Sequence, residues 1–217
     1  MAQILLLIGP PGSGKTTYAE AIIAKNKYRL ISAGQLVRDF AKGKSRAAKA
    51  VARVMKTGNL APNQIVDKLM MAKLKQRAKG FVLDGYPRTL AQARLLTRLI
   101  LQQKWPREAL LWIDISEADI VRRLSSRVYC PLGGEPYILP KKLCSVHQAK
   151  LVRRPDDEPR VIKKRLGIFH QRIEPLKKYF AEFATIVKVK VTDKNSPEQN
   201  VKLVLQALKK HKLLGAN

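Results

Sequence analysis

Residues 9–16 have the types and spacing of a phosphate-binding loop. They read Gly-Pro-Pro-Gly-Ser-Gly-Lys-Thr and fit the pattern G-x-x-x-x-G-K-[ST]. Glycines let backbone N–H groups approach phosphate oxygens where a side chain would block them. Lys15 can reach the β- and γ-phosphates, and the Thr16 hydroxyl can hold Mg²⁺. We therefore expect a nucleoside triphosphate and Mg²⁺ to bind here, at Gly9, Pro10, Gly12, Ser13, Gly14, Lys15, Thr16 and Thr17.

A second group of candidate residues follows another apolar run and begins at Asp84. A carboxylate at the end of a strand beside a phosphate loop can hold Mg²⁺, often through its water shell. The Gly-Tyr-Pro segment that follows fixes the chain so that Arg88 can reach into the same cleft. Gln92 lies one helical turn further on, and its amide offers both a donor and an acceptor, which matches the edge of adenine.

Basic residues gather in the segment 121–165, which holds twelve Lys and Arg but only four Asp and Glu. Phosphoryl transfer concentrates negative charge on non-bridging oxygens, and planar guanidinium groups stabilise that charge when water is excluded. A solvated surface explains some of these cations. The candidates for the chemistry are Arg123, Arg127, Arg154 and Arg165.

Short apolar strands alternate with helical patterns along most of the chain. Strands are predicted at 4–8, 29–31, 81–83, 110–113 and 186–191, and helices at 14–25, 34–56 with a break near Gly43, 63–78, 89–103, 117–126, 159–181 and 197–211. This alternation predicts an α/β fold with a parallel sheet covered by helices on both faces. Ligands of such folds bind at the carboxyl ends of the strands, which is where both candidate groups lie.

The segment 127–158 interrupts the alternation, because it is rich in Pro, Gly and basic residues and has no long periodic apolar stretch. A segment of that length without regular structure is usually a lid or a small inserted subdomain. We expect it to close over the triphosphate.

Composition limits the class of protein. The formal net charge is +27, which attracts polyanions, but the basic residues are dispersed along several predicted helices and indicate solvated faces. No aromatic-rich strand motif or zinc-finger spacing supports a dedicated nucleic-acid site. No apolar run is long enough to span a bilayer, and no signal peptide is evident, so we expect a cytoplasmic protein that binds no membrane. The cytoplasm is reducing, so we expect no disulfide between Cys130 and Cys144.

Taken together, these residues resemble the adenylate kinases that carry a long lid. The resemblance covers nearly the whole chain and also includes Ile31-Ser32-Ala33-Gly34 and Arg165-Leu166. It implies a P-loop NTPase-type sheet of five parallel strands within one kinase domain. The core would comprise 1–31, 62–123 and 162–217, with a nucleoside-monophosphate-binding insert at 32–61 and a lid at 124–161. The implied reaction is MgATP + AMP ⇌ 2 ADP, in a protein expected to be a monomer.

The resemblance also implies roles for individual residues. The phosphate loop, Asp84, Arg123 and Arg127 would bind MgATP, and the catalytic cations would be Lys15, Arg88, Arg123, Arg154 and Arg165. No general base is required, because the nucleophile is a phosphate oxygen of AMP that is already ionised at pH 7. Residues implied to bind AMP are Ser32, Ala33, Arg38, Met55, Gly58, Leu60, Gly85, Arg88, Gln92, Arg154 and Arg165.

Some positions depart from the family pattern. Ala33 replaces a threonine that usually helps to bind AMP, Gln35 replaces an acidic residue, and a glycine near the ATP adenine is missing around Asp193. These changes affect the expected affinity more than the type of reaction.

The lid leaves two interpretations open. Zinc-bearing family members carry two Cys-x-x-Cys-like pairs, whereas this chain has Cys130 with Gly133 and then Cys144 with His147. One interpretation is a structural Zn²⁺ held by Cys130, Cys144 and His147, with Glu135 or water as the fourth ligand. The other is a metal-free lid held by packing and hydrogen bonds.

Two rival functions also follow from the sequence. One is a kinase for UMP or CMP, against which the long lid and the pairing of Arg88 with Gln92 argue. The other is an RNA-binding or ribosome-associated protein that retains a phosphate loop, which only the net charge suggests.

Overall fold

The computed structural model describes residues 3–105, 109–134 and 136–214. Five parallel strands form its central sheet in the order β2-β3-β1-β4-β7, which confirms the predicted α/β class. The strands are β1 (Gln3–Ile8), β2 (Arg29–Ser32), β3 (Gly80–Asp84), β4 (Ala109–Asp114) and β7 (Thr185–Lys190). All five predicted strands are present, with ends that differ by at most one residue.

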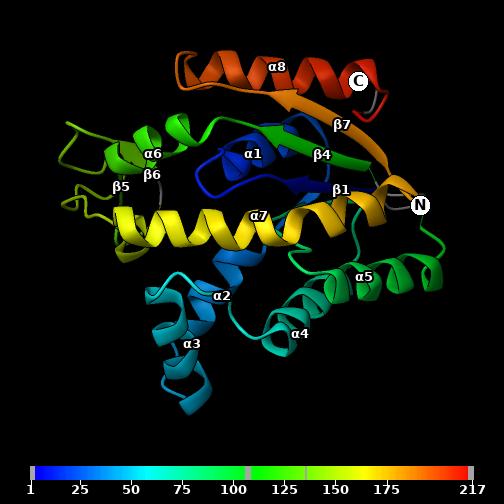
Figure 1. Cartoon of the computed structure of the whole chain (residues 1–217), viewed down its shortest axis with the longest axis horizontal. Helices are drawn as coiled ribbons and strands as arrows, with labels where there is room; N and C mark the ends of the chain where they lie inside the picture. Colours follow the sequence, from blue (N-terminus) through cyan, green and yellow to red (C-terminus); the bar gives the residue numbers. More distant parts are fainter. Residues whose placement is uncertain (1–2, 106–108, 135, 215–217) are drawn as a thin grey trace.

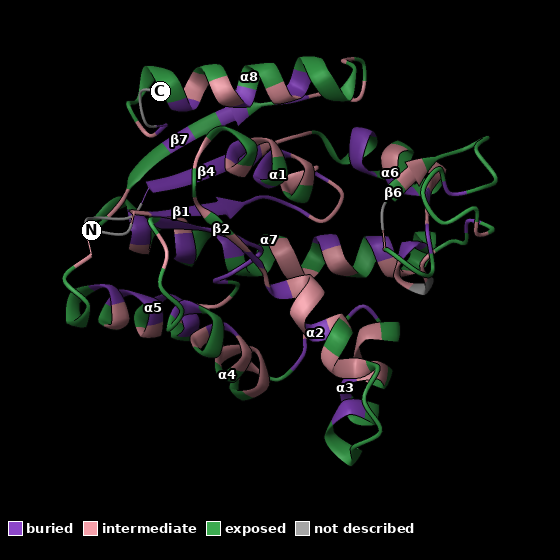
Figure 2. Cartoon of the chain, turned by 180° about the vertical axis from the view of Figure 1, so that it is seen from behind, coloured by how far each residue is buried: buried purple, intermediate pink, exposed green. Residues whose placement is uncertain are grey.

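Helices cover both faces of the sheet. Alternate side chains of each strand point to opposite faces, so β1, β3 and β4 each contribute to two separate cores. In β1, Ile4, Leu6 and Ile8 pack in one core with residues of α4 (Asn63–Leu74), α5 (Leu90–Gln102) and α7 (Pro159–Ala181). Leu5 and Leu7 pack in the other core with α1 (Lys15–Lys25) and α8 (Pro197–Lys210). Figure 1 shows α8 lying along β7, with α4 and α5 on the other side of the sheet. Figure 2 shows β1 and β4 almost entirely buried, whereas β7 at the edge of the sheet is partly exposed.

Capping side chains begin several of the helices. The predicted helix 34–56 is divided into α2 (Ala33–Ala41) and α3 (Arg46–Lys56), as expected from Gly43. Ser45 begins α3, because its side chain accepts a hydrogen bond from Ala48 N, and Ser32 caps α2 in the same way. The predicted helix 63–78 is too long, since α4 ends at Leu74 and the chain turns back toward β3 there. Helices α6 (Glu117–Ser126) and α7 have the predicted bounds.

The segment 127–158 contains regular structure that the sequence analysis did not predict. Strands β5 (Arg127–Tyr129) and β6 (Pro136–Ile138) pair antiparallel, and a short 3₁₀ helix, η1 (Pro155–Asp157), precedes α7. Each strand has only three residues, too few to show a period of two in the sequence.

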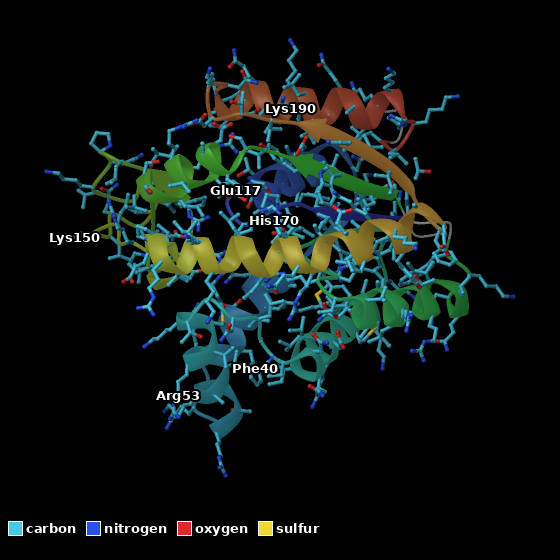
Figure 3. The ribbon with its side chains drawn as sticks, in the orientation of Figure 1. Phe40, Arg53, Glu117, Lys150, His170 and Lys190 are labelled. Carbon is cyan, nitrogen blue, oxygen red and sulfur yellow. The ribbon has the colours of Figure 1, made fainter. Side chains whose placement is uncertain are left out.

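Basic side chains occur on parts of the molecule that lie far apart. Figure 3 labels Arg53 on α3, Lys150 in the segment after β6 and Lys190 in β7, which are three separate parts of the molecule. Among the helices of the described residues, none has the length and apolar character needed to cross a membrane.

Candidate active site

The phosphate loop connects β1 to α1. Gly12 and Gly14 adopt positive φ angles of 80° and 89°, a conformation that side chains disfavour. A Cβ at Gly12 would also lie 2.8 Å from Leu124 Cγ. Ser13 is buried within the loop. Thr17 faces elsewhere, because it lines a hollow between α1 and α8.

Lys15 lies inside the loop. Its Nζ donates to the backbone oxygens of Gly9 at 2.9 Å and Pro10 at 2.8 Å, and to Ser13 Oγ at 3.3 Å. Burial lowers the pKa of Lys15 to about 8. Asp84 opposes this shift in the pKa, and nearby arginines, Arg88 first among them, add to it.

Asp84 brings two predicted site residues together. Its Oδ2 accepts hydrogen bonds from Thr16 Oγ1 at 2.7 Å and from Ser32 Oγ at 3.0 Å. Register places Ser32 opposite Asp84, since β2 and β3 are paired there. Carboxylate and hydroxyl oxygens are the hard donors that Mg²⁺ prefers. These residues therefore fit the metal predicted from the sequence, and the structure adds Ser32 to the group.

The backbone N–H group of Arg88 is hydrogen-bonded to the side chain of Gln92. Arg88 Nε donates to Gly85 O at 2.8 Å, and Arg88 N donates to Gln92 Oε1 at 2.8 Å. Gln92 is only 2% exposed, and its Nε2 donates to Asn63 Oδ1 at 3.3 Å. Burial lowers the pKa of Arg88, and repulsion from Arg165 contributes to that shift. Asn63 was not among the predicted site residues.

Gln35 orients Arg38. Gln35 Oε1 accepts from Arg38 Nη2 at 2.8 Å and Nε at 3.3 Å, so an amide oxygen acts where the family usually has an acidic side chain. Burial lowers the pKa of Arg38 to about 10, with repulsion from Arg154 as the next cause. Arg38 and Arg154, from segments far apart in the chain, therefore repel each other electrostatically.

Two acidic residues of η1, just before α7, hold two of the predicted arginines. Arg127 binds Asp157 through both oxygens, with Nε–Oδ2 at 2.8 Å and Nη2–Oδ1 at 2.6 Å. Arg165 Nη1 lies 2.9 Å from Asp156 Oδ2. Such charge-assisted contacts fix the planes of the guanidinium groups. Burial, followed by repulsion from Arg127, lowers the pKa of Arg154, whose guanidinium stacks 5.1 Å from the Tyr129 ring centroid.

Arg123 is held by backbone oxygens near the phosphate loop. Its Nη2 donates to Thr192 O at 2.7 Å and its Nη1 to Ser13 O at 3.5 Å. Tyr18 also contacts Arg123: burial raises the pKa of Tyr18, and the hydrogen bond with Arg123 opposes that shift in pKa. Nothing in the spacing of the sequence indicates Tyr18. Near Thr192, Asp193 Oδ1 lies 3.1 Å from Arg122 Nη2.

The remaining predicted AMP residues lie in and beside the segment 32–61. Gly58 faces α7, because a Cβ there would lie 2.8 Å from Val161 Cγ1 and 3.4 Å from Arg165 Cγ. Ala33 is buried in the core beneath the sheet. Met55 and Leu60 are half-buried, and Met55 packs against a small cluster formed by Val37, Val51 and Ala61.

Cys130, Cys144 and His147 form one cluster in the segment after β5. Each sulfur lies 3.5 Å from His147 Nδ1, and the three ligand atoms lie within 4.8 Å of one another. A tetrahedral zinc site separates a sulfur and a nitrogen ligand by roughly 3.6 Å. Backbone N–H groups of Gly133 and His147 donate to the two sulfurs. The donor set and its spacing therefore fit Zn²⁺.

Hydrogen bonds to the Cys144 sulfur change the pKa of this thiol. Burial raises its pKa, but donors outweigh burial and hold the pKa of this thiol at about 6. They are the Tyr137 hydroxyl, 3.2 Å from the sulfur, and the backbone N–H groups of His147 and Val146. Glu135, a predicted fourth ligand, lies outside the described residues.

The chain matches known proteins over most of its length. The family model described as adenylate kinase matches residues 7–185. An adenylate kinase of Thermotoga neapolitana is 34% identical over 198 residues, covering 87% of this chain and 90% of that protein. An adenylate kinase of Anaeromyxobacter sp. is 35% identical over 187 residues, with 82% and 87% covered.

An archaeal relative shows similar agreement. The adenylate kinase of Thermococcus kodakarensis is 34% identical over 191 residues, and the match covers 85% of each chain. The match of the family model includes the phosphate loop, Asp84, Arg88 and the arginines from 123 to 165. The five-stranded parallel sheet agrees with it. This chain belongs to the adenylate kinase family.

Proposed function

We propose that this protein, an enzyme of the adenylate kinase family, transfers the γ-phosphoryl group of MgATP to AMP and forms two ADP. The observation that carries the proposal is the convergence of cations around the phosphate loop. Lys15, Arg38, Arg88, Arg154 and Arg165 each have a pKa lowered first by burial, and repulsion from neighbouring cations contributes in every case. Such a site gains most from a ligand with many negative charges.

The chemistry follows from this arrangement. An ionised phosphate oxygen of AMP attacks the γ-phosphorus in line, the bond to the β-phosphate oxygen breaks, and ADP leaves. Charge on the transferred group is spread over its equatorial oxygens, which Lys15, Arg88 and Arg165 can stabilise. No side chain has to remove a proton, so positioning and charge stabilisation supply the catalysis.

Residues of the phosphate loop bind the ATP phosphates. Thr16, Asp84 and Ser32 would hold Mg²⁺, directly or through water, and the metal neutralises charge on the phosphates when bound. Arg123, fixed between Ser13 O and Thr192 O, lies at the ATP end of the site.

Arg38 and Arg88 bind the phosphate of AMP, and Gln92 binds its base. Residues 32–61 form the insert that admits AMP, and residues 124–161 form a lid that closes over ATP. In the closed lid, Arg127 and Arg154 would contact the phosphates, and water would be kept from accepting the phosphoryl group. We further propose a monomeric, cytoplasmic enzyme.

A coupled assay of ADP formation tests the function. Purified protein should form ADP from MgATP and AMP, with a higher kcat/KM for AMP than for UMP or CMP. Equal rates with AMP and CMP would contradict the role of Gln92. Absence of turnover, together with strongly salt-dependent RNA binding, would favour the rival RNA-binding function instead.

We also propose that Zn²⁺ binds Cys130, Cys144 and His147 and stabilises the lid. The apolar core of this segment is small, consisting of Val128, the two cysteines and Leu151 with Tyr137 and Ala149 against it. Several other apolar side chains of the segment are exposed: Leu132, Ile138, Leu139, Leu143 and Val146. A metal would supply the cross-link that packing does not.

Elemental analysis of protein purified without chelator should find about one zinc per chain, the stoichiometry of a single structural site. Cys144→Ser should lose the metal and lower the temperature at which the lid unfolds. Gly133→Cys should bind zinc more tightly in chelator competition, because the N–H group of residue 133 already lies 3.5 Å from Cys130 Sγ in a Cys-x-x turn. Ser145→Ala, an exposed neighbour of Cys144, is the control. A metal-free protein with an ordered lid would contradict the zinc site.

Nucleotide binding should take up a proton above pH 8. The pKa of Lys15 is lowered from 10.5 to about 8, and the charges of a bound triphosphate raise that pKa again. We expect uptake of up to about one proton per ATP near pH 9, and an affinity that falls as pH rises above 8. The unfolded chain keeps this proton between pH 8 and 10.5, so Lys15 makes the nucleotide-free protein more stable as pH rises through that window.

Calorimetry of a non-hydrolysable ATP analogue in two buffers of different ionisation enthalpy measures the uptake. Lys15→Ala should abolish it, and Lys25→Ala, an exposed lysine at the end of the same helix, should not. Equal heats in both buffers for the unmodified protein would contradict the lowered pKa.

A further inference from the structure

We propose that Asn63 is a positioning residue that sets the orientation of the Gln92 amide and thereby makes the enzyme reject 6-oxo purines. This inference rests on the proposed function, because it concerns the base of the monophosphate. Asn63 is the first residue of α4, directly after the insert 32–61 rejoins the core.

Hydrogen bonds among Arg88, Gln92, Asn63 and Thr89 fix the orientation of the Gln92 amide. Arg88 N–H can only donate, so the atom of Gln92 that faces it at 2.8 Å must be the oxygen Oε1. Nε2 therefore points to Asn63 Oδ1, at 3.3 Å. Asn63 Nδ2 in turn donates to Thr89 Oγ1 at 3.4 Å, and that oxygen also accepts from Gln92 N. The oxygen and nitrogen of the Gln92 amide are thus distinguished by their partners.

Each amide atom keeps one further capacity to bond. Nε2 has a second N–H, and Oε1 has a second lone pair. Together they form a donor–acceptor pair that matches the N1 acceptor and the 6-amino donor of adenine. A 6-oxo purine presents the reverse pattern, with a donor at N1 and an acceptor at position 6.

Binding a 6-oxo purine would require the Gln92 amide to rotate by half a turn. Its NH₂ group would then face the Arg88 N–H, and its oxygen would face Asn63 Oδ1. Because Gln92 is only 2% exposed, water cannot replace these lost partners. The Arg88 N–H group and Asn63 Oδ1 therefore both oppose the rotation. The first belongs to the backbone, so only the contact with Asn63 can be removed by substituting a side chain.

Asn63 itself can partly relieve the clash. If its own amide also turned, Nδ2 would face Gln92 and Oδ1 would face the Thr89 hydroxyl, which can donate. An aspartate at position 63 has no donor and cannot turn in this way. Asn63→Asp should therefore discriminate at least as well as the unmodified protein, whereas Asn63→Leu removes the acceptor and should discriminate less.

The experiment measures kcat/KM for AMP and for IMP, with saturating MgATP. In Asn63→Leu the ratio of AMP to IMP should fall about three- to tenfold, the effect of one lost hydrogen bond. In Asn63→Asp the ratio should stay the same or rise. Gln64→Leu, an exposed amide next in the chain, is the matched control and should leave the ratio unchanged.

A purely structural role for Asn63 would lower the rates with AMP and IMP together and leave their ratio unchanged. A ratio in Asn63→Leu within twofold of the unmodified protein, or a fall in Asn63→Asp, would overturn the inference. Asn63→Ala serves as a second variant if the leucine variant does not fold. Absence of ADP formation by the unmodified protein would instead overturn the proposed function, so the two failures are distinguishable.

Discussion

Lys15→Ala is expected to lower kcat/KM for ADP formation by roughly 10²–10⁵-fold. Lys15 is the cation inside the phosphate loop, held by the carbonyl oxygens of Gly9 and Pro10. Its ammonium group can follow the γ-phosphoryl from ATP to AMP, so it stabilises charge in the transition state as well as in the bound substrate. The loss should therefore appear in kcat and not only in KM.

Lys25→Ala is the matched control for this variant. It removes one positive charge from the exposed end of the same helix, α1, at a distance from the loop. Circular dichroism and thermal unfolding should show that both variants fold. Near-normal turnover in a folded Lys15→Ala protein would contradict the assignment of the loop.

Arg88→Ala should cause a loss of similar size, roughly 10²–10⁵-fold in kcat/KM, because a positioned guanidinium supplies that much in phosphoryl transfer. Arg88 is anchored by Gly85 O, and its own backbone N–H holds Gln92. It therefore joins the proposed phosphate and base contacts of AMP. The KM for AMP should rise while the KM for ATP changes little.

Arg88→Lys separates charge from geometry. Lysine keeps the charge but cannot bind two oxygens in one plane, so its activity should lie between those of the alanine variant and the unmodified protein. Arg94→Ala, an exposed arginine on α5, is the control. If Arg88→Ala raised the KM for ATP rather than AMP, Arg88 would belong to the other half of the site.

The sequence predicted the phosphate loop, the five strands and the break between α2 and α3 because each depends on neighbouring residues. Glycines of the loop have the positive φ angles that the motif requires, and Ser45 caps α3. The antiparallel pair in the segment 127–158 was not predicted. Its strands are short, and Ile138 in β6 is exposed, so hydrophobic periodicity could not indicate them.

Contacts between distant residues could not be predicted in the same way. The hydrogen bonds of Asp84 to Thr16 and Ser32 span 68 and 52 residues of the chain. Asn63 next to Gln92 and Tyr18 next to Arg123 also involve residue types that have many other uses in proteins. The role of each of these residues depends on which side chain it contacts in the folded protein, and not on its residue type.

The sequence by itself determined that a nucleotide-binding loop lies at the carboxyl edge of a parallel sheet, because motif spacing and apolar alternation are local properties of the chain. Only the tertiary structure decided which side chains orient the predicted arginines and which way the Gln92 amide faces. The physical reason is that a hydrogen bond or ion pair depends on distance and direction in space. Strand register, helix packing and the start of α4 at Asn63 set that geometry, and none of them is encoded in the spacing of one motif.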